Sequence, residues 1–327
     1  MPGRATTKQR LVAPLVVLGA GALVVSGVVV GMDDLSLPFA AGEACVAEVD
    51  GHRVEVSIEQ AENAATIAAI GVRRGLPARA VSIALATAYQ ESDLQNIDYG
   101  DRDSLGLFQQ RPSQGWGTEM EVQDPVYATN AFYDALVDVS DYRTLPITEA
   151  AQAVQRSGFP SAYADHEQDA RALASALTGN SAEAFACRLD GELEAGDPRL
   201  VDSGLTERAD DVRADLEERF GDLALGGFAP GGVRDGHMEG STHYDGRAVD
   251  IFVRPVNDEN RKRGWAIAQY LVGQADRLAI QTVIFDDRIW KAGSRSGDGW
   301  RDYNAPSGSG DRAILEHRDH IHVDVFD

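Results

Sequence analysis

The chain has 327 residues, of which 52 are acidic and 30 basic, and its formal net charge is −22. This length allows two domains of ordinary size, and 43% hydrophobic and 25% charged residues are typical of a globular protein rather than a disordered one. An excess of negative charge repels phosphate backbones, which argues against nucleic acid as a partner.

The first apolar run covers residues 11–32 and contains no charged residue. As a helix it would span about 33 Å, enough to cross a bilayer core. Basic residues precede it, and Asp33 and Asp34 follow it. This order predicts a cytoplasmic tail at 1–10, a single-pass anchor in the cell membrane, and the rest of the chain outside. A cleaved secretory signal is the alternative, and it also exports the rest of the chain.

Cys45 and Cys187 are the only two cysteines. Outside the cytoplasm an even number of cysteines favours a disulfide, so we expect these two to be joined. Such a bridge would mark the two ends of a first domain, 45–187.

Helical spacing of apolar residues dominates this first domain. Ser57 and Gln60 form a predicted capping box, and Asp124 followed by Pro125 is typical of a helix start. The expected helices cover residues 57–75, 78–92, 124–139, 148–157 and 161–179. We therefore expect an all-α domain.

A Gly- and Gln-rich insert at 96–120 interrupts the helices, directly after Glu91 ends the second one. Long irregular inserts in compact domains usually carry function. A carboxylic acid that keeps its proton at the negative end of a helix dipole can protonate a glycosidic oxygen. A solvated glutamate at a helix end is the plainer interpretation.

The segments "QESDL" at 90–94 and "SLGLFQ" at 104–109 together resemble the soluble lytic transglycosylases and goose-type lysozymes. This resemblance covers roughly residues 53–180 and implies a lysozyme-like fold with Glu91 as the acid/base. It also implies saccharide contacts by Ser104, Gly106, Leu107 and Gln109, and, through the looser match "AAQAVQRSGFPSAY", by Gln155 and Tyr163. No second carboxylate is evident, although Asp101 and Asp103 lie in the insert, and one carboxyl group suits a lytic transglycosylase.

A polar stretch with Gly and Pro, 188–199, reads as a linker to a second domain at 200–327. An amphipathic helix is expected at 205–221 and another at 258–278, with strands at 247–253, 280–285 and 321–326. This mixture predicts an α+β domain.

Histidines gather in this second domain. His320 and His322 are two residues apart, so they share one face of the predicted last strand, and His243 lies seven residues before Asp250 in an apolar strand. Two imidazoles and a carboxylate can form an open tetrahedral zinc site. Histidines that merely hydrogen-bond to Asp or to the backbone are the alternative.

The same residues resemble the zinc D,D-peptidases, a family of D-Ala-D-Ala carboxypeptidases, dipeptidases and murein endopeptidases. "STHYDGRAVD" fits S-x-H-x-x-G-x-A-x-D, and "HIH" fits H-x-H. The resemblance covers about 222–327 and implies Zn²⁺ held by His243, Asp250 and His322. It leaves open whether His320 or Asp319 is the general base. The segment "GGVR" makes Arg234 a candidate ligand for a substrate carboxylate or oxyanion.

The two resemblances share one substrate, peptidoglycan, with one head suited to glycan strands and the other to stem peptides. The sequence thus predicts a membrane-anchored bacterial enzyme that remodels peptidoglycan. The rival hypothesis is a cell-wall-binding or assembly protein in which one or both heads only bind the polymer.

Overall fold

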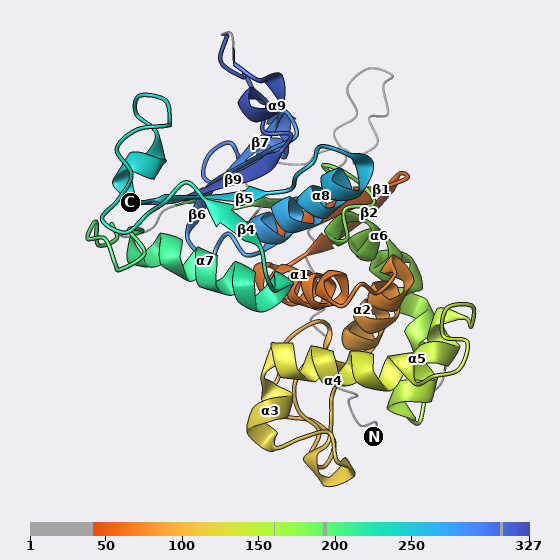
Figure 1. Ribbon diagram of the computed structural model, residues 1–327. Coiled ribbons are helices and arrows are strands. Elements are labelled where there is room, and N and C mark those ends of the chain that lie inside the picture. Colours follow the sequence, from red (N-terminus) through yellow and green to blue (C-terminus); the bar gives the residue numbers. More distant parts are fainter. Residues whose placement is uncertain (1–41, 160, 192–194, 308–309) are drawn as a thin grey trace, which may run out of the picture. The chain divides into compact units, whose positions relative to one another are not determined.

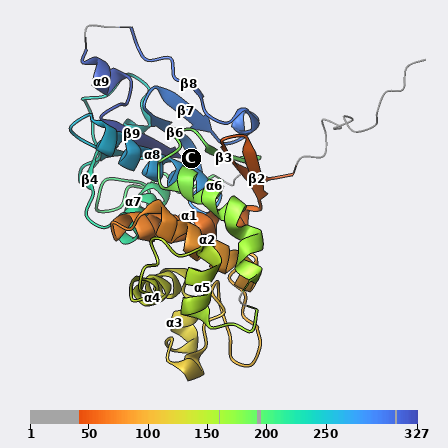
Figure 2. The same cartoon turned by 90° about the vertical axis from the view of Figure 1, so that its right-hand side faces the viewer.

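A computed structural model of the protein describes residues 42–159, 161–191, 195–307 and 310–327. Figure 1 shows a β-sheet in the upper part of the picture and a group of helices in the lower part. Figure 2 shows the same order from the side.

The chain opens with a hairpin that the sequence analysis did not predict. Strands β1 (Ala44–Val49) and β2 (His52–Val56) are joined by Asp50 and Gly51, both at positive φ. An Asp-Gly pair between alternating apolar residues is a strong signal for a tight hairpin turn. β3 (Phe185–Arg188) pairs with β1 on its other side, which gives a three-stranded sheet in the order β2-β1-β3.

The disulfide predicted between the two cysteines is confirmed. Cys45 on β1 and Cys187 on β3 are register partners in neighbouring antiparallel strands, and their sulfur atoms are bonded. The bridge therefore fastens the start of the described chain to the end of its first helical region.

Helices follow the hairpin. The capping box of Ser57 and Gln60 opens α1 (Ile58–Arg73), and α2 (Ala78–Ser92) follows it. Asp124 caps α4 with its side chain, with Pro125 at the first position, as predicted. The bounds of the other elements in this region are η2 Pro112–Gln114, α3 Glu119–Gln123, α4 Pro125–Val137, α5 Ile147–Gln155, η3 Ala162–His166 and α6 Glu167–Leu177.

The second half contains the six-stranded sheet, whose strand order is β4-β5-β9-β6-β7-β8 with every pair antiparallel. Its strands are β4 Ala224–Gly226, β5 Ala248–Phe252, β6 Ile280–Phe285, β7 Arg288–Lys291, β8 Arg301–Asp302 and β9 His320–Val325. Its helices are α7 Glu207–Phe220, η4 Thr242–Asp245, α8 Asp258–Gly273, η5 Ser296–Asp298 and α9 Arg312–Leu315. β9 lies inside the sheet, and all six of its residues are buried.

Specific buried hydrogen bonds join the two halves. The side chain of Gln269 on α8 donates to the carbonyl oxygen of Ala176 and accepts from the amide of Phe185. The indole of Trp290 on β7 donates to the carbonyl oxygen of Cys187. Residues 42–327 accordingly form one compact unit. The division at 188–199 stays a prediction.

The predicted fold class is corrected by these sheets. The first half is not all-α, because β1, β2 and β3 form a sheet against its helices, and α6 packs on β1 and β2. The described residues have a mixed α/β fold with two sheets.

The described residues do not bear out the predicted membrane anchor. Within residues 42–327, apart from the short gaps named above, no helix is long and apolar enough to cross a membrane. Residues 1–41, which include the predicted tail and anchor, lie outside the described part of the chain.

Candidate metal centre and glutamate site

Two neighbouring strands bring Asp250 and His322 together. Asp250 on β5 and His322 on β9 are direct register partners in an antiparallel pair, so their side chains leave the same face of the sheet. The imidazole Nδ1 of His322 lies 3.3 Å from Asp250 Oδ1. Both residues are at most 9% exposed.

His243 completes a triangle with these two side chains. It lies in the short helix η4, where Ser241 accepts a hydrogen bond from the His243 amide and Gly246 ends the turn at positive φ. Its Nε2 lies 3.2 Å from Asp250 Oδ1 and 3.1 Å from His322 Nδ1. The three atoms are thus mutually 3.1–3.3 Å apart.

This triangle fits a zinc ion. Bonds of about 2.0–2.1 Å in a tetrahedral site separate neighbouring ligand atoms by about 3.3 Å. Buried polar atoms of one carboxylate and two imidazoles at this spacing are the donor set that zinc prefers. The fold brings His243, Asp250 and His322 close together, and their role as metal ligands stays a prediction.

Further contacts hold the rings with these nitrogens facing inward. The carbonyl oxygen of Gly227 lies 2.8 Å from Nδ1 of His243, and because a carbonyl can only accept, this nitrogen carries a proton. In His322 the other nitrogen, Nε2, lies 3.3 Å from Asp324 Oδ2. Carboxylates and carbonyls that accept from the far nitrogen are the usual supports of metal-binding histidines.

Hydrogen bonds within the triangle and with Asp324 shift the pKa values of Asp250 and His322. Burial would raise the pKa of Asp250, but hydrogen bonds with His243 and His322 outweigh it and hold that pKa well below its usual range. Burial would lower the pKa of His322, but its hydrogen bonds with Asp250 and Asp324 raise it to about 9.

His237 lies beside the triangle and was not predicted. His237, His243 and Asp250 offer ligand atoms within 4.8 Å of one another, so this cluster could bind a metal ion. The rings of His237 and His243 are stacked, with centroids 3.9 Å apart and planes 20° from parallel. Lone pairs of nearly parallel rings do not converge on one point, so we rank His322 above His237 as the third ligand.

His320 and Asp319 occupy the edge of this centre. His320 Nε2 lies 3.9 Å from Asp250 Oδ1, while its Nδ1 lies 2.7 Å from Asp319 Oδ1. Asp319 also accepts from Arg254, at 2.7 Å. Burial raises the pKa of Asp319, but the hydrogen bonds from His320 and Arg254 lower it overall.

A third histidine of the same segment, His317, faces His320 and His322 with ring centroids 4.6 and 5.9 Å away. Burial, followed by its two histidine neighbours, lowers the pKa of His317 to about 3.

Arg234 is exposed on the loop between β4 and η4.

Three hydrogen bonds join the segments that carry the predicted glycan-site residues, and one of them involves Glu91. The hydroxyl of Tyr163 donates to Glu91 Oε1 at 2.7 Å. Ser92 Oγ donates to the carbonyl oxygen of Leu107 at 2.8 Å, and Gln155 Nε2 donates to that of Phe108 at 2.7 Å. The end of α2 thus contacts both the 104–109 segment, through Ser92, and the α5–η3 region, through Glu91.

The insert places the other predicted residues nearby. Ser104 is buried, Gly106 has a positive φ of 73°, and Gln109 donates to the carbonyl oxygens of Tyr99 and Gly106. Asp103 is held by Arg111 and Ser113, and hydrogen bonds from Ser113, then Arg111, keep its pKa well below its usual range. The Asp103 carboxylate therefore holds parts of the insert together, while Asp101 is exposed.

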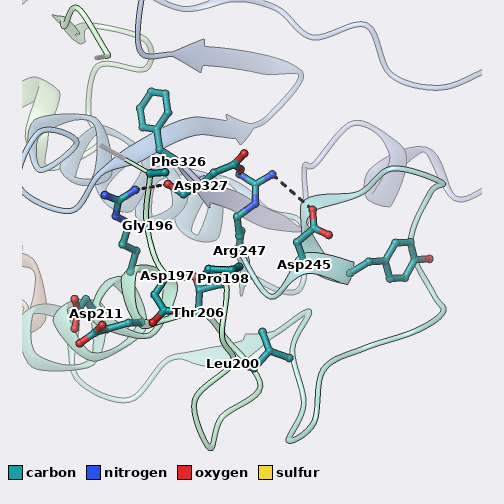
Figure 3. Close-up of a pocket in the computed structure, with 14 residues that line it drawn as sticks. Gly196, Asp197, Pro198, Leu200, Thr206, Asp211, Asp245, Arg247, Phe326 and Asp327 are labelled. Atoms are coloured by element: carbon teal, nitrogen blue, oxygen red, sulfur yellow. Dashed lines mark hydrogen bonds and ion pairs between the residues drawn. The ribbon is translucent and has the colours of Figure 1, made fainter. Parts of the chain in front are cut away.

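Another pocket is lined by residues that include Tyr244, Arg247 and Asp327 (Figure 3). Arg247 contacts the side chain of Asp327 there, and Arg208 donates to the carbonyl oxygen of the same residue. The residues that line this pocket include none of the predicted site residues.

Comparison with known proteins gives one family. A family model described as VldE, C-terminal domain, matches residues 201–313, and no curated protein matches the chain. The matched range contains His237, His243 and Asp250 and ends before β9. It does not extend to the half that carries Glu91. Together, the match and the histidine–aspartate cluster point to a peptidase-like domain with a candidate metal site in the second half of the chain.

Proposed function

We propose that the second half of the chain is a zinc-dependent D,D-peptidase that acts on the stem peptides of peptidoglycan. The observation that carries this proposal is the buried triangle of His243 Nε2, Asp250 Oδ1 and His322 Nδ1. The S-x-H-x-x-G-x-A-x-D and H-x-H motifs support the peptide substrate.

The triangle residues would hold the ion. A zinc ion in such a site supplies Lewis-acid polarisation of a carbonyl group and activation of water. Gly227 and Asp324 accept from the outward nitrogens, so each imidazole can bind an ion through its inward nitrogen once that nitrogen carries no proton. The buried surroundings exclude bulk water, which strengthens the electrostatic interactions of these groups.

His320 is the proposed proton acceptor. Its Nδ1 donates to Asp319, since a carboxylate only accepts, so in the neutral imidazole the lone pair is on Nε2, which faces Asp250. Asp319 is occupied by His320 and Arg254, which supports His320 as the base and Asp319 as its partner. Nε2 can take up a proton during attack on the peptide and return it to the leaving amine.

A second activity is proposed for the first half, cleavage of glycan strands with Glu91 as acid/base. The hydrogen bonds that join the three motif segments, one of them from Tyr163 to Glu91, favour this activity. Tyr163 holds one oxygen of the carboxyl group and thereby orients the other. The rival proposal is a protein that binds peptidoglycan with one or both halves and cleaves nothing.

Mass spectrometry of products separates these possibilities. The zinc-loaded protein is incubated with a stem pentapeptide ending in D-Ala-D-Ala, with cross-linked muropeptides, and with glycan strands. We expect peptide products that disappear in Asp250→Ala, and glycan fragments that disappear in Glu91→Gln. Co-sedimentation with peptidoglycan without any product would support the binding protein and overturn both activities.

A further inference from the structure

Arg254 lies two residues after the end of β5 and reaches a buried carboxylate at the edge of the candidate metal centre. Its Nε and its Nη2 both lie 2.7 Å from Oδ2 of Asp319. The Arg254 guanidinium also lies over the ring of Phe252, 4.2 Å from the centroid. Two donors on one oxygen and a ring beneath them leave the guanidinium little freedom, so it fixes the rotation of the Asp319 carboxylate.

Because Arg254 donates to Oδ2 of Asp319, the other carboxylate oxygen, Oδ1, can accept a hydrogen bond from His320. Oδ1 lies 2.7 Å from Nδ1 of His320, the short distance expected for a charge-assisted hydrogen bond. Asp319 and His320 are 5% and 7% exposed. A carboxylate so deeply buried needs a cation or several donors, and Arg254 is the cation that the fold supplies.

The backbone brings these three side chains together from two strands. Phe252 is the register partner of His320, and the Val253 amide donates to the carbonyl oxygen of Asp319 at 2.9 Å. Asp319 precedes the first residue of β9, so strand alternation does not force it to the opposite face. The chain turns just before it, at His317, which has a positive φ of 51°.

We infer that Arg254 is a positioning residue: through Asp319 it holds the His320 ring with Nδ1 as donor and with Nε2 turned toward Asp250. This inference rests on the proposed function at one point, which is that Nε2 of His320 accepts a proton. As a positioning residue, Arg254 contacts neither the three proposed ligands nor the substrate.

A competing role for Arg254 is direct binding of a substrate carboxylate, the role that the sequence suggested for Arg234. The guanidinium is half exposed, with 52% of its side chain accessible, so a carboxylate could reach it. The two roles differ in what they change. A substrate ligand contributes to KM, whereas a positioning residue contributes to kcat.

The first arm of the test needs no activity. The variants are Arg254→Ala, Arg254→Lys and Asp319→Asn, with Arg295→Ala as control, because Arg295 forms an exposed ion pair with Asp298. ¹⁵N NMR of the imidazole nitrogens of the zinc-loaded protein reports the tautomer of His320. We expect a single Nδ1–H tautomer in the wild type and in the control. Both tautomers should appear in Arg254→Ala, and the Nε2–H tautomer in Asp319→Asn. A wild-type Nε2–H tautomer, or an Arg254→Ala spectrum equal to that of the wild type, would overturn the inference.

The second arm measures kinetics on the D-Ala-D-Ala pentapeptide, together with zinc content. Loss of a supporting residue around a metal site typically costs about 10- to 100-fold. We expect Arg254→Ala to lower kcat by about this factor, with KM within about twofold and zinc content unchanged. Arg254→Lys should recover part of kcat, and Arg254→Ala combined with Asp319→Asn should be no worse than Asp319→Asn alone. A raised KM with unchanged kcat would assign Arg254 to substrate binding instead. A wild type that cleaves no peptide would sink the proposed function, while the NMR arm would still decide the role of Arg254.

Discussion

Gly227 offers the sharpest perturbation of the candidate metal centre. Its φ is +79°, and a methyl group added there would lie 2.3 Å from Cε1 of His243, 2.5 Å from its Nδ1 and 3.0 Å from Oδ2 of Asp250. The imidazole would have to retreat by roughly 1 Å to regain ordinary van der Waals contact. Gly227→Ala therefore moves a proposed ligand without removing any ligand atom.

Gly231→Ala is the matched control. Gly231 lies on the same loop with a φ of +82°, and a methyl group there would meet nothing within 4 Å. Both substitutions place alanine in a left-handed conformation, which costs about 1–2 kcal/mol of stability in each variant. The difference between them isolates the contact with His243.

Zinc affinity is the property to measure, by competition with a chelator of known affinity. Displacing His243 also strains its hydrogen bond to the Gly227 carbonyl, and loss of such support costs about 10- to 100-fold in affinity. We expect this loss in Gly227→Ala and an affinity within about twofold of wild type in Gly231→Ala. Equal zinc affinity in the two variants would refute the assignment of His243 as a ligand.

Three further predictions test other parts of the molecule. Replacing Cys45 or Cys187 by Ala should lower the unfolding free energy by about 2–5 kcal/mol in denaturant titrations, because the bridge closes a long loop; an unchanged midpoint would contradict this. Glu91→Gln should abolish release of glycan fragments with the melting temperature kept, whereas the same change at exposed Glu119 should leave release intact. Burial raises the pKa of Glu62 to about 7 from 4.5, so the folded state gains stability from the protonated form below pH 4.5 and loses it as the pH rises through 7. Wild-type melting temperature should therefore fall more between pH 5 and pH 8 than that of Glu62→Gln, and parallel curves would contradict the shift.

The residues of the candidate metal centre could be predicted from the resemblance to the zinc D,D-peptidases, and strand periodicity agrees with their placement. His320 and His322 share a strand face, and the pairing of β5 with β9 places Asp250 opposite His322. The same alternation extends to Asp324, two residues further on, so this support of His322 was readable from the sequence and was missed. Arg254 continues the face of Asp250 and Phe252 in the same way.

Other features carry no such signal. The hydrogen-bond acceptor for Nδ1 of His243 is the backbone carbonyl of Gly227. Every residue type has a backbone carbonyl, so no sequence pattern indicates this contact. His237 depends on the course of the Gly-rich loop between β4 and η4, which sequence patterns do not fix. The hairpin at Asp50 and Gly51 had a clear turn signal, but the long helical runs after it led to the expectation of an all-α domain.

The pairing of Asp319 with His320 was missed for a specific physical reason. Alternation along a regular strand separates neighbouring side chains onto opposite faces. Asp319 lies before β9 begins, after the turn at His317, so the rule does not apply to it. Its contact with Nδ1 of His320 makes it a partner of the proposed base rather than the base itself.

Anomalous X-ray scattering at the zinc edge, from crystals of the protein purified with zinc, tests the central claim most directly. The account predicts one peak bounded by His243 Nε2, Asp250 Oδ1 and His322 Nδ1, and no peak at this position in His322→Ala. A peak held by His237 with His322 outside bonding distance, or no peak among these side chains at full zinc supply, would contradict it.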